Sequence, residues 1–426
     1  MYTNDWPEVS LAEIVSCQGG CAFSPSLQGR TQGASAFFKV SDMNRRENMW
    51  IMRQANNYVS PDDEARINGK KKPAGSVIFP KVGAAIFTNK KRFLAEPAFV
   101  DNNVMAVWST DPRRCLPEFL FLHFLTISLS TLANPGPLPS ISNSRIYDCT
   151  IHLPPLEVQK KITAILFRVR EAVAVQQRLA ESAYDLKRAT LNELFSRGLR
   201  REAQKVTDIG PVPESWDVFP LSDHHSVGSG GTPSRSAPEY WTGGAIPWVK
   251  TTEVNYCVIR KTEEKITQVG LEKSAAKLLL PGTLLMAMYG QGVTRGKVAV
   301  LGIEAACNQA CAWISPIDQR VDTQYLYHFL TYRYYAIRQL AHGGQQQNLN
   351  LDIVRALPIA VPRDRDTQRS VAAILDTIDS KSDIHLRKRD LLDELFRSLL
   401  HKLMAGEVRV SELDLSALPS PAEKSA

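Results

Sequence analysis

The chain has 426 residues, of which 44% are hydrophobic and 22% are charged. This composition is typical of globular proteins with two or three domains, and it excludes a disordered, collagen-like or purely coiled-coil chain. The 51 Lys and Arg residues exceed the 44 Asp and Glu residues by seven, an excess too small to establish nucleic-acid binding by itself.

The sequence shows no sign of export or of a membrane anchor. No apolar run approaches the roughly 20 residues that a helix needs to cross a bilayer. The opening MYTNDWPEVS lacks the basic stretch and following apolar stretch of a secretory signal. The seven cysteines are an odd number, which in a large chain without such a signal indicates reduced thiols. We therefore expect a cytoplasmic location.

The two halves of the chain repeat each other in sequence. Gln159–Leu166 (QKKITAIL) matches Gln368–Leu375 (QRSVAAIL) at an offset of 209 residues, and Glu118–Phe121 matches Gln324–Tyr327 at an offset of 206. Further matches occur upstream in the same order and at similar offsets. This repeat predicts a tandem duplication, in which each copy has a globular part followed by a helix.

Each globular part is predicted to be rich in β-strands. Short apolar or alternating runs bounded by Gly, Pro and Asn are typical of strands. The strands predicted in this way are 77–79, 84–88 and 104–108 in the first copy and 282–288, 297–302 and 310–314 in the second. The periodicity and length of 119–132 and 325–340 indicate one helix in each copy.

A long helix is predicted after each globular part, beyond a proline. Its seam positions step by three and four residues, as in a heptad repeat. The seam predicted for the first helix is Ile162, Ile165, Val169, Ala172, Gln176, Leu179, Ala183, Leu186 and Thr190. The seam predicted for the second helix is Ile374, Ile378, Lys381, His385, Lys388, Leu392, Leu395 and Leu399. Two such seams are best buried against each other, which predicts an antiparallel coiled coil.

The intervals between shared residues predict helices of unequal length. From the shared Gln to the shared Phe, the first helix runs from 159 to 195 and the second from 368 to 396, which is eight residues less. Eight residues correspond to about 12 Å of helical rise.

The whole pattern predicts an α+β fold with two tandem β-rich domains, each followed by a long helix. The predicted order is a first domain (1–155), a central helical spacer (156–207), a second domain with its entry linker (208–363), a C-terminal helical spacer (364–410) and a flexible tail (411–426). Prolines punctuate the entry linker, as they do in connecting segments.

No constellation of catalytic or metal-binding residues is recognisable. The run GQGVTRGKVAV (290–300) has Gln291 where a phosphate-binding loop has its first glycine, and Val298 where that loop needs Ser or Thr. The Asn-Pro-Pro-aromatic motif of amino-methyltransferases does not occur. The cysteine pairs are spaced as C-x₃-C, whereas zinc knuckles favour two residues between ligands. We therefore predict no catalytic residue, no metal and no cofactor in this chain.

Positive charge is concentrated in the two globular parts. Residues 30–92 hold 13 Lys and Arg against five Asp and Glu, a net charge of +8. Residues 228–300 hold nine against five, a net charge of +4. Such clusters favour phosphate backbones, because each neutralised phosphate releases counterions. The alternative for any single cluster is a solvated loop.

Polar loops beside these clusters are candidates for contacts with DNA. Lys and Arg hold phosphates, whereas Asn and Gln pair with adenine and Arg with guanine in the major groove. The candidates in the first domain are Arg30, Gln32, Lys39, Asn44, Arg45, Lys71 and Lys81. The candidates in the second domain are Arg235, Tyr240, Lys250, Gln291, Arg295, Gln345, Gln346 and Gln347.

Several long segments carry a resemblance to a known family. They include GPVPESWDVFPLSD (210–223), GGTPSRSAPEYWTGGAIPWVKTTEVN (230–255), GGQQQNLNLDIVRALPIAVP (343–362) and, in the first copy, LPSISNSRIYDCTIHLPPLEVQKKITAIL (138–166). On these segments the chain resembles the DNA-specificity subunit of type I restriction–modification systems. The resemblance covers about residues 1–410.

This resemblance implies a division of labour. Two target-recognition domains each read one half of a split DNA sequence, and the helices set the gap between the halves. The helices also dock two copies of a methyltransferase subunit, which carries S-adenosylmethionine and modifies adenine. A motor–nuclease subunit completes the restriction complex. The chain itself is then expected to be a non-catalytic subunit that binds double-stranded DNA.

Three alternatives remain open at this point. The chain is compatible with the specificity subunit of another restriction–methylation type, which only its partner would distinguish. A protein-binding scaffold built on the helical pair is a second alternative, and the clustered positive charge argues against it. A stand-alone nuclease or methyltransferase is a third, and the missing motifs argue against it.

Overall fold

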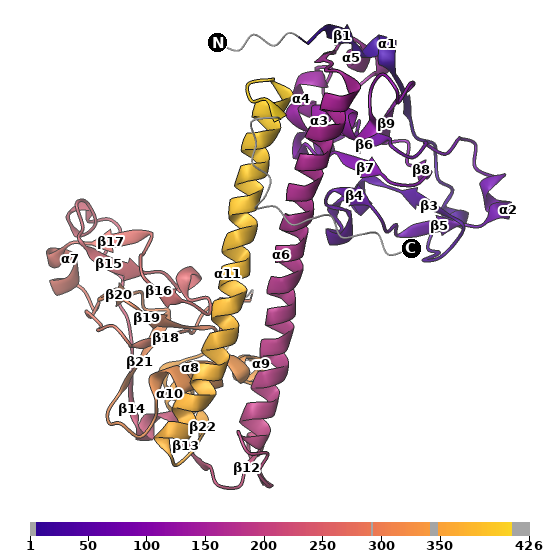
Figure 1. Cartoon of the computed structure of the whole chain (residues 1–426). Coiled ribbons are helices and arrows are strands. Elements are labelled where there is room, and N and C mark those ends of the chain that lie inside the picture. Colours follow the sequence, from indigo (N-terminus) through magenta and orange to yellow (C-terminus); the bar gives the residue numbers. More distant parts are fainter. Residues whose placement is uncertain (1–5, 291–292, 341–347, 411–426) are drawn as a thin grey trace. The chain divides into compact units, whose positions relative to one another are not determined.

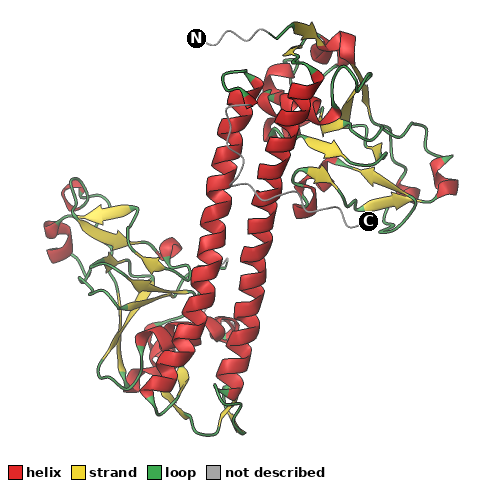
Figure 2. Ribbon diagram, in the orientation of Figure 1, coloured by secondary structure: helices red, strands yellow, loops and turns green. Residues whose placement is uncertain are grey.

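The computed structural model describes residues 6–290, 293–340 and 348–410. The chain divides into two compact units, a first unit (residues 1–177 and 387–426) and a second unit (residues 178–386). Figure 1 traces the chain through its elements, and Figure 2 shows its helices and strands. Two long helices, α6 (Leu156–Arg197) and α11 (Arg365–Met404), contribute residues to both units.

The first unit contains a five-stranded sheet and a three-stranded sheet. The strands of the larger sheet, in their order across it, are β2 (Val15–Gly19), β9 (Val104–Ser109), β6 (Val77–Pro80), β7 (Arg92–Leu94) and β4 (Ile51–Met52). The strands of the smaller sheet are β5 (Asn57–Val59), β3 (Ser35–Phe38) and β8 (Phe99–Val100). The pairs β4–β7 and β3–β8 are parallel, and the other neighbours are antiparallel.

The second unit contains the same two sheets. The strands of its larger sheet are β14 (His225–Ser229), β21 (Cys311–Pro316), β18 (Leu284–Ala287), β19 (Val298–Leu301) and β16 (Val258–Ile259). The strands of its smaller sheet are β17 (Glu264–Ile266), β15 (Ile246–Val249) and β20 (Ala306–Cys307). The parallel pairs are again the edge pair β16–β19 and the pair β15–β20. Strand order and direction therefore repeat throughout, and the duplication predicted from the sequence is confirmed.

Each domain is closed by a two-stranded sheet that joins its beginning to its end. In the first unit, β1 (Glu8–Ser10) pairs with β10 (Thr150–His152), and in the second, β13 (Asp217–Pro220) pairs with β22 (Pro358–Val361). A hairpin of β11 (Gln204–Thr207) and β12 (Gly210–Pro213) precedes the second domain. The shorter helices are α1 (Leu11–Ile14), α2 (Pro61–Glu64), α3 (Pro117–Thr126), α4 (Leu129–Leu132), α5 (Asn143–Tyr147), α7 (Gln268–Glu272), α8 (Thr323–Tyr332), α9 (Tyr334–Gln339) and α10 (Leu351–Arg355).

A buried glutamine fixes the start of each long helix to its domain. In α6, Gln159 donates to the carbonyls of Pro154 (2.9 Å) and Arg114 (3.0 Å) and accepts from the Leu116 N–H (2.9 Å). Both Gln159 and its counterpart in α11, Gln368, are fully buried. These are the first residues of the repeated sequence QxxxxAIL, so the repeat encodes the junction between domain and helix.

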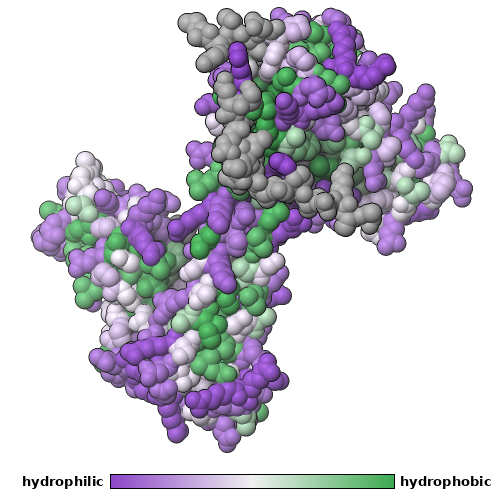
Figure 3. All heavy atoms as spheres, in the orientation of Figure 1, coloured by the Kyte–Doolittle hydropathy of each residue, from purple (hydrophilic) through white to green (hydrophobic). Residues whose placement is uncertain are grey.

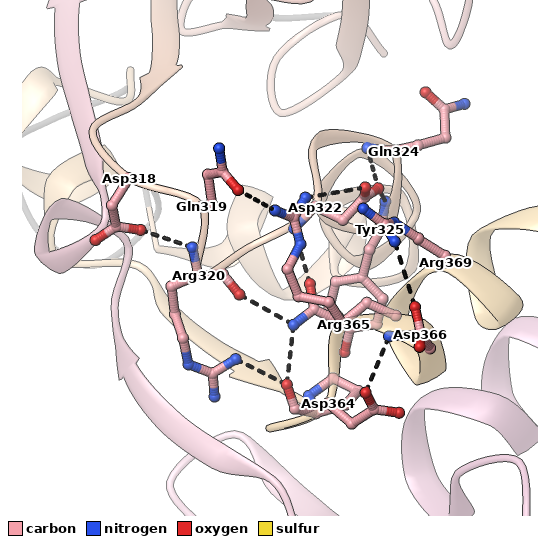
Figure 4. A network of polar contacts seen from close by, with 12 residues as sticks. Asp318, Gln319, Arg320, Asp322, Gln324, Tyr325, Asp364, Arg365, Asp366 and Arg369 are labelled. Atoms are coloured by element: carbon pink, nitrogen blue, oxygen red, sulfur yellow. Dashed lines mark hydrogen bonds and ion pairs between the residues drawn. The ribbon is translucent and has the colours of Figure 1, made fainter.

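Gln368 makes the equivalent bonds in the second unit. It donates to the carbonyls of Pro362 (2.9 Å) and Arg320 (3.0 Å) and accepts from the Asp322 N–H (2.7 Å). Charged side chains surround this junction in Figure 4, where Arg365 lies 3.6 Å from Asp322. The chain therefore leaves both domains through the same hydrogen-bonded turn.

Within the first unit, α6 packs against α11 in the antiparallel direction. Arg170 forms an ion pair with Asp393 (2.6 Å), and further along α6, Gln177 accepts a hydrogen bond from Arg389 (2.7 Å). Residue numbers thus rise along one helix as they fall along the other. The indole of Trp50 lies under the Arg170 guanidinium at 4.8 Å and contacts aromatic rings of both helices. The first domain is thereby packed against the helix pair.

Within the second unit, other polar contacts join the same two helices to the domain. Lys187 of α6 forms an ion pair with Asp379 of α11 (2.5 Å). One turn before Asp379, Asp376 accepts hydrogen bonds from His328 (2.8 Å) and Gln324 (2.7 Å) of α8. Phe195 fills the apolar part of this junction against aromatic rings of the domain. The predicted pairing of the helices is confirmed in each unit.

The heptad seams predicted for the helices are only partly correct. Ile162, Ile165 and Val169 are buried, but Leu179 and Leu186 are 41% and 55% exposed. Four residues of the seam predicted in α11 are exposed, namely Ile374, Lys381, Lys388 and Leu395, whereas Leu375 and Phe396 are buried. The domains cover these helices near their ends. The residues buried there are those that face the domain, and they do not form one uninterrupted heptad pattern.

Other details of the sequence prediction were wrong. Residues 84–88 belong to a 3₁₀ helix (Gly83–Thr88), in which Ile86 is buried and Phe87 is exposed. A short apolar run does not distinguish strand from helix, and this one turns instead of extending. The helices predicted at 119–132 and 325–340 are each divided in two, because Ile127 and Ser128 are extended and Arg333 leaves the helical conformation.

The predicted difference in helix length was also wrong. Helix α6 has 42 residues and α11 has 40, because α11 continues for eight residues beyond Phe396. Helix α6 ends at Arg197, so β11 occupies the last part of the interval 156–207 that was predicted as a helical spacer. The predicted tail, 411–426, lies outside the described residues.

Three further features of the described chain concern its thiols, its helices and its surface. All seven cysteines are free thiols. In the part of the chain that the structure describes, no helix is both long enough and apolar enough to cross a membrane. Hydrophilic residues cover most of the described surface on the face drawn in Figure 3.

Candidate nucleic-acid interface

Three segments of the second unit meet beyond the end of its larger sheet. Met288, which follows β18, donates its N–H to the carbonyl of Ala310 (2.8 Å) and accepts from the N–H of Leu349 (3.1 Å). The first contact holds the turn between β20 and β21, and the second holds the segment that enters α10. We call residues 288–290, 308–310 and 348–349 the loop corner of the second unit.

The loop corner is where two of the predicted DNA-binding loops begin or end. One loop leaves Met288 toward Gln291, and the other, which carries Gln345, Gln346 and Gln347, returns at Leu349. These four glutamines lie outside the described residues. The structure therefore brings the flanks of the two loops together.

The first unit has the same loop corner. Lys81 donates its N–H to the carbonyl of Asn103 (2.9 Å) and accepts from the N–H of Ile141 (2.8 Å). Gly83 also donates to the carbonyl of Pro139 (2.8 Å). The loop corner of the first unit therefore comprises residues 81–83, 101–103 and 139–141. Sequence reasoning missed the last two segments. The repeat, which matches Ile141 with Leu349, could have found 139–141.

Lys39 and Lys250, both predicted from the sequence, occupy equivalent places beside the two loop corners. Lys39 directly follows β3, whose last residue accepts from the Asp101 N–H (2.9 Å). Lys250 directly follows β15, whose last residue accepts from the Asn308 N–H (3.1 Å). In each case a carboxylate three residues later accepts from the lysine N–H at 2.7 Å. In each unit a lysine thus directly follows a strand end that is bonded to the turn.

The charge around these lysines differs between the units. Lys39 donates to the neutral amide of Gln28 (2.7 Å). Lys250 contacts the carboxylates of Glu263 and Glu264, and its hydrogen bond to Glu263 is the main reason that the pKa of Lys250 lies above its usual value. A phosphate near Lys250 would have to compete with these two glutamates, whereas Lys39 has no such competitor in its hydrogen bond.

Two further lysines strengthen the positive charge of the first loop corner. The Lys81 ammonium lies over Gly19, where a Cβ atom would come within 2.5 Å of it. Lys72 is 3% exposed and donates to Gln18 (2.7 Å), and its burial lowers its pKa. Lys81, which is partly exposed, is thus a candidate for a phosphate contact, and Lys72 is a buried neighbour.

Arg235 and Tyr240 lie on the loop that precedes β15. The Arg235 guanidinium stacks on Trp241 at 3.7 Å and forms an ion pair with Glu264 (2.5 Å), and its side chain stays 54% exposed. Tyr240 is partly buried, and its backbone carbonyl accepts from the Thr267 N–H. Stacking on Trp241 fixes the plane of the Arg235 guanidinium, and this orientation favours contact with a planar group.

Arg295 is not on the surface that the prediction assumed. Its residue is 4% exposed, so the side chain is packed inside the second unit. Position in a polar loop identified it as a candidate, but a loop position says nothing of which way the side chain turns. Arg295 is therefore buried, whereas the prediction expected an exposed side chain.

The remaining candidates of the first unit lie along its smaller sheet and the nearby turns. Arg30 pairs with Asp63 (2.5 Å), and Lys71 pairs with Glu64 (2.8 Å), so both bind acids of helix α2. Arg45 donates to the amides of neighbouring loop residues, and Asn44 accepts from a lysine. Gln32 is exposed. Among the described residues, no hydrogen bond or ion pair joins these side chains to the loop corner, so their contacts are separate from those of Lys39 and Lys81.

Two other polar sites in the second unit are occupied by internal partners. His328, Asp376 and Asp379 have possible metal-ligating atoms within 4.8 Å of one another. However, the Lys187 ammonium already binds Asp379, and His328 binds Asp376. These groups act as a polar link between helices.

A cavity of about 560 Å³ lies near the start of α11. Its two arginines, Arg365 and Arg369, contact Asp322 and Asp366. Positive charge in this cavity is therefore matched by carboxylates.

Comparison with known proteins gives the same family twice along the chain. The family model described as the type I restriction modification DNA specificity domain matches residues 3–182 and 213–394. The MjaIX type I restriction enzyme specificity subunit of Methanocaldococcus jannaschii is 27% identical over 47% of this chain and 47% of its own length. The MjaVIII specificity subunit of the same organism is 22% identical over 65% of this chain and 66% of its own length. The chain thus spans less than two thirds of these relatives in the matched regions.

Longer matches exist at similar identity. The HindI type I restriction enzyme specificity subunit of Haemophilus influenzae is 26% identical, over 95% of this chain and 100% of its own length. Among solved structures, the type I restriction–modification S subunit from M. genitalium matches with a TM-score of 0.63 and 13% identity, over 95% of this chain and 97% of that one. The structural match supports the same fold.

Proposed function

Because the chain belongs to the family of the type I restriction modification DNA specificity domain, we propose that it is the sequence-reading subunit of a restriction–modification complex. It binds double-stranded DNA and recognises a target in two parts. Each unit reads one part with the segments around its loop corner.

One observation carries this proposal: the two units share a backbone frame but differ in the side chains on it. The same hydrogen bonds hold Lys81 and Met288, yet one residue is a cation and the other is apolar. The turns that they hold read Asp-Asn-Asn (101–103) and Asn-Gln-Ala (308–310). A duplicated frame with different polar groups is what two different half-sites require.

In this proposal the basic residues hold the DNA backbone and the amides specify bases. Lys39, Lys81 and Lys250 bind phosphates beside the loop corners. Gln291, Gln345, Gln346 and Gln347, which lie outside the described residues, belong to loops whose flanks are at the second corner. Arg235 contributes its stacked, exposed guanidinium.

The chain acts without catalytic residues or a cofactor of its own. Two copies of a methyltransferase subunit bind along the helix pair, carry S-adenosylmethionine and methylate adenine, and a motor–nuclease subunit joins them for restriction, all in the cytoplasm. Exposed apolar residues on both helices support a docking role, including Leu186 (55% exposed) and Leu391 (66% exposed). Such residues on polar helices favour burial against a partner.

The test is DNA binding by the chain in complex with its methyltransferase subunit. We expect affinity for one split sequence to exceed that for random DNA by at least about 10³-fold at physiological salt. We also expect the logarithm of the affinity to fall linearly with the logarithm of the salt concentration.

Binding without sequence preference, or without salt dependence, would contradict the proposal. The scaffold alternative predicts that result together with an intact protein complex. Methylation or cleavage by the purified chain alone would instead support the alternative of a stand-alone enzyme.

A further inference from the structure

We propose that the tips of the two loop-corner turns, Asn102 in the first unit and Gln309 in the second, are base-reading residues that determine specificity, one for each half-site. Neither was among the residues predicted from the sequence. The inference rests on the proposed function and adds to it the groups that distinguish one target from another.

The turns stand at equivalent places. In the first unit the turn joins β8 to β9, and in the second it joins β20 to β21. The residue before each tip, Asp101 or Asn308, is bonded to the strand end that precedes Lys39 or Lys250. The residue after each tip, Asn103 or Ala310, accepts from Lys81 or Met288. Each tip therefore stands between a residue bonded to the strand that precedes Lys39 or Lys250 and a residue bonded to Lys81 or Met288.

The base of each turn is closely packed against a glycine. A Cβ atom on Gly20 would lie 2.1 Å from the Val100 carbonyl oxygen, and one on Gly230 would lie 2.0 Å from that of Cys307. Only glycine allows this approach of the neighbouring strand, and both units have it. A tip on such a base is held in place before DNA binds, so that less conformational entropy is lost on contact.

The tips themselves are accessible and carry the right groups. Asn102 and Gln309 are both exposed. Asn102 has no hydrogen-bond partner among the residues that the structure describes. Gln309 accepts a hydrogen bond from the Thr232 hydroxyl, which orients the amide and leaves its NH₂ group to donate.

The residues before the tips are committed to the turn itself. The Asp101 carboxylate accepts from the backbone N–H (2.9 Å) and the side chain (2.8 Å) of Asn103. The Asn308 amide oxygen accepts from the Thr251 hydroxyl (2.9 Å). In each turn one polar residue thus shapes the backbone and the next faces outward.

The chemistry of the tips selects base edges in the major groove. An Asn or Gln amide donates to one acceptor and accepts from one donor, which matches the N7 and N6 groups of adenine. Asn is one methylene shorter than Gln, so the same frame holds its amide closer to the turn. This difference suits two units that read different sequences.

The experiment measures the sequence preference of the complex on DNA with a randomised target. We expect Gln309→Ala to relax the preference at one or two positions of one half-site, with a loss of discrimination of roughly tenfold or more. The other half-site keeps its preference, and the salt dependence is unchanged. Asn102→Ala has the same effect on the opposite half-site.

A second substitution changes the preference instead of removing it. Gln309→Glu puts an acceptor where an amide donated, and carboxylates accept from the amino group of cytosine. We expect the affected position to shift toward cytosine. Gln268→Ala, at another exposed glutamine of the second unit, is the matched control and leaves every position unchanged.

Wild-type preference at every position in Gln309→Ala, Gln309→Glu and Asn102→Ala would overturn this inference and leave the proposed function intact. A wild-type complex that shows no split preference would instead overturn the proposed function. Thermal unfolding of each variant separates a folding defect from a reading defect, because a folding defect weakens binding to all sequences equally.

Discussion

At the scale of single residues, Gln159 and Gln368 each satisfy three backbone groups with one buried amide. A buried donor or acceptor left without a partner costs more than the hydrogen bond contributed. These two residues therefore decide how firmly each domain is held at the start of its long helix.

Replacing Gln368 by leucine should lower the free energy of unfolding. The substitution leaves the Asp322 N–H and the carbonyls of Arg320 and Pro362 unsatisfied, so we expect a loss of about 2–3 kcal/mol. Denaturant titration followed by tryptophan fluorescence measures it. Gln319→Leu, on an exposed residue of the same junction, should stay within about 0.5 kcal/mol of wild type. Equal stability of Gln368→Leu and wild type would show that the junction does not depend on this amide.

Residue type and charge clustering predicted part of the candidate site. Lys39 and Lys250 were selected independently, and the structure places them at equivalent points of the two units. Arg295 was selected by the same criteria and is buried. Asn102 and Gln309 were missed, because a polar turn of three residues carries no signal until the strands on either side are paired.

At the scale of elements, the contact between α6 and α11 in the first unit combines an ion pair with aromatic stacking. The Arg170 side chain is 20% exposed and that of Asp393 is 26% exposed. Burial lowers the pKa of Arg170, and the Asp393 carboxylate opposes this change. A partly buried pair of this kind depends on both partners, because removing one leaves the other poorly solvated.

A double-mutant cycle on Arg170 and Asp393 should therefore show coupling. We expect Arg170→Met and Asp393→Asn each to lower the free energy of unfolding. The double variant should lose about 1 kcal/mol less of that free energy than the sum of the two single losses. Arg397 is a second partner of Asp393, and the Arg397 side chain is 76% exposed. Arg397→Ala should therefore lower the free energy of unfolding by less than about 0.5 kcal/mol. Strict additivity of the two central variants would mean that the ion pair contributes nothing to the helix contact.

The sequence predicted the long helices and the central strands of the larger sheets, because these elements are long or strongly apolar. It did not predict the smaller sheets, whose strands have two to four residues. Parallel pairs such as β3–β8 join residues about 60 positions apart, so no local pattern reports them. The run 84–88 forms a 3₁₀ helix for the related reason that a short run of four apolar residues fits either state.

At the scale of the whole molecule, the duplication is the feature that connects sequence, fold and proposed function. Two units repeat the same sheets, the same buried glutamine and the same loop corner. The polar groups at the corners differ. One chain can thus present two different readers on one type of frame, which is what a target in two parts demands.

The most direct test of this account is a map of DNA methylation in cells that express the chain with its methyltransferase subunit. The account predicts that one new motif becomes methylated, in two defined halves separated by a gap of fixed length and arbitrary sequence. Gln309→Ala should reduce the sequence preference in one half of the motif and leave the preference in the other half unchanged. A methylation map that does not change when the chain is added, or a new motif without a gap, would contradict the central claim that two units of this chain read two half-sites.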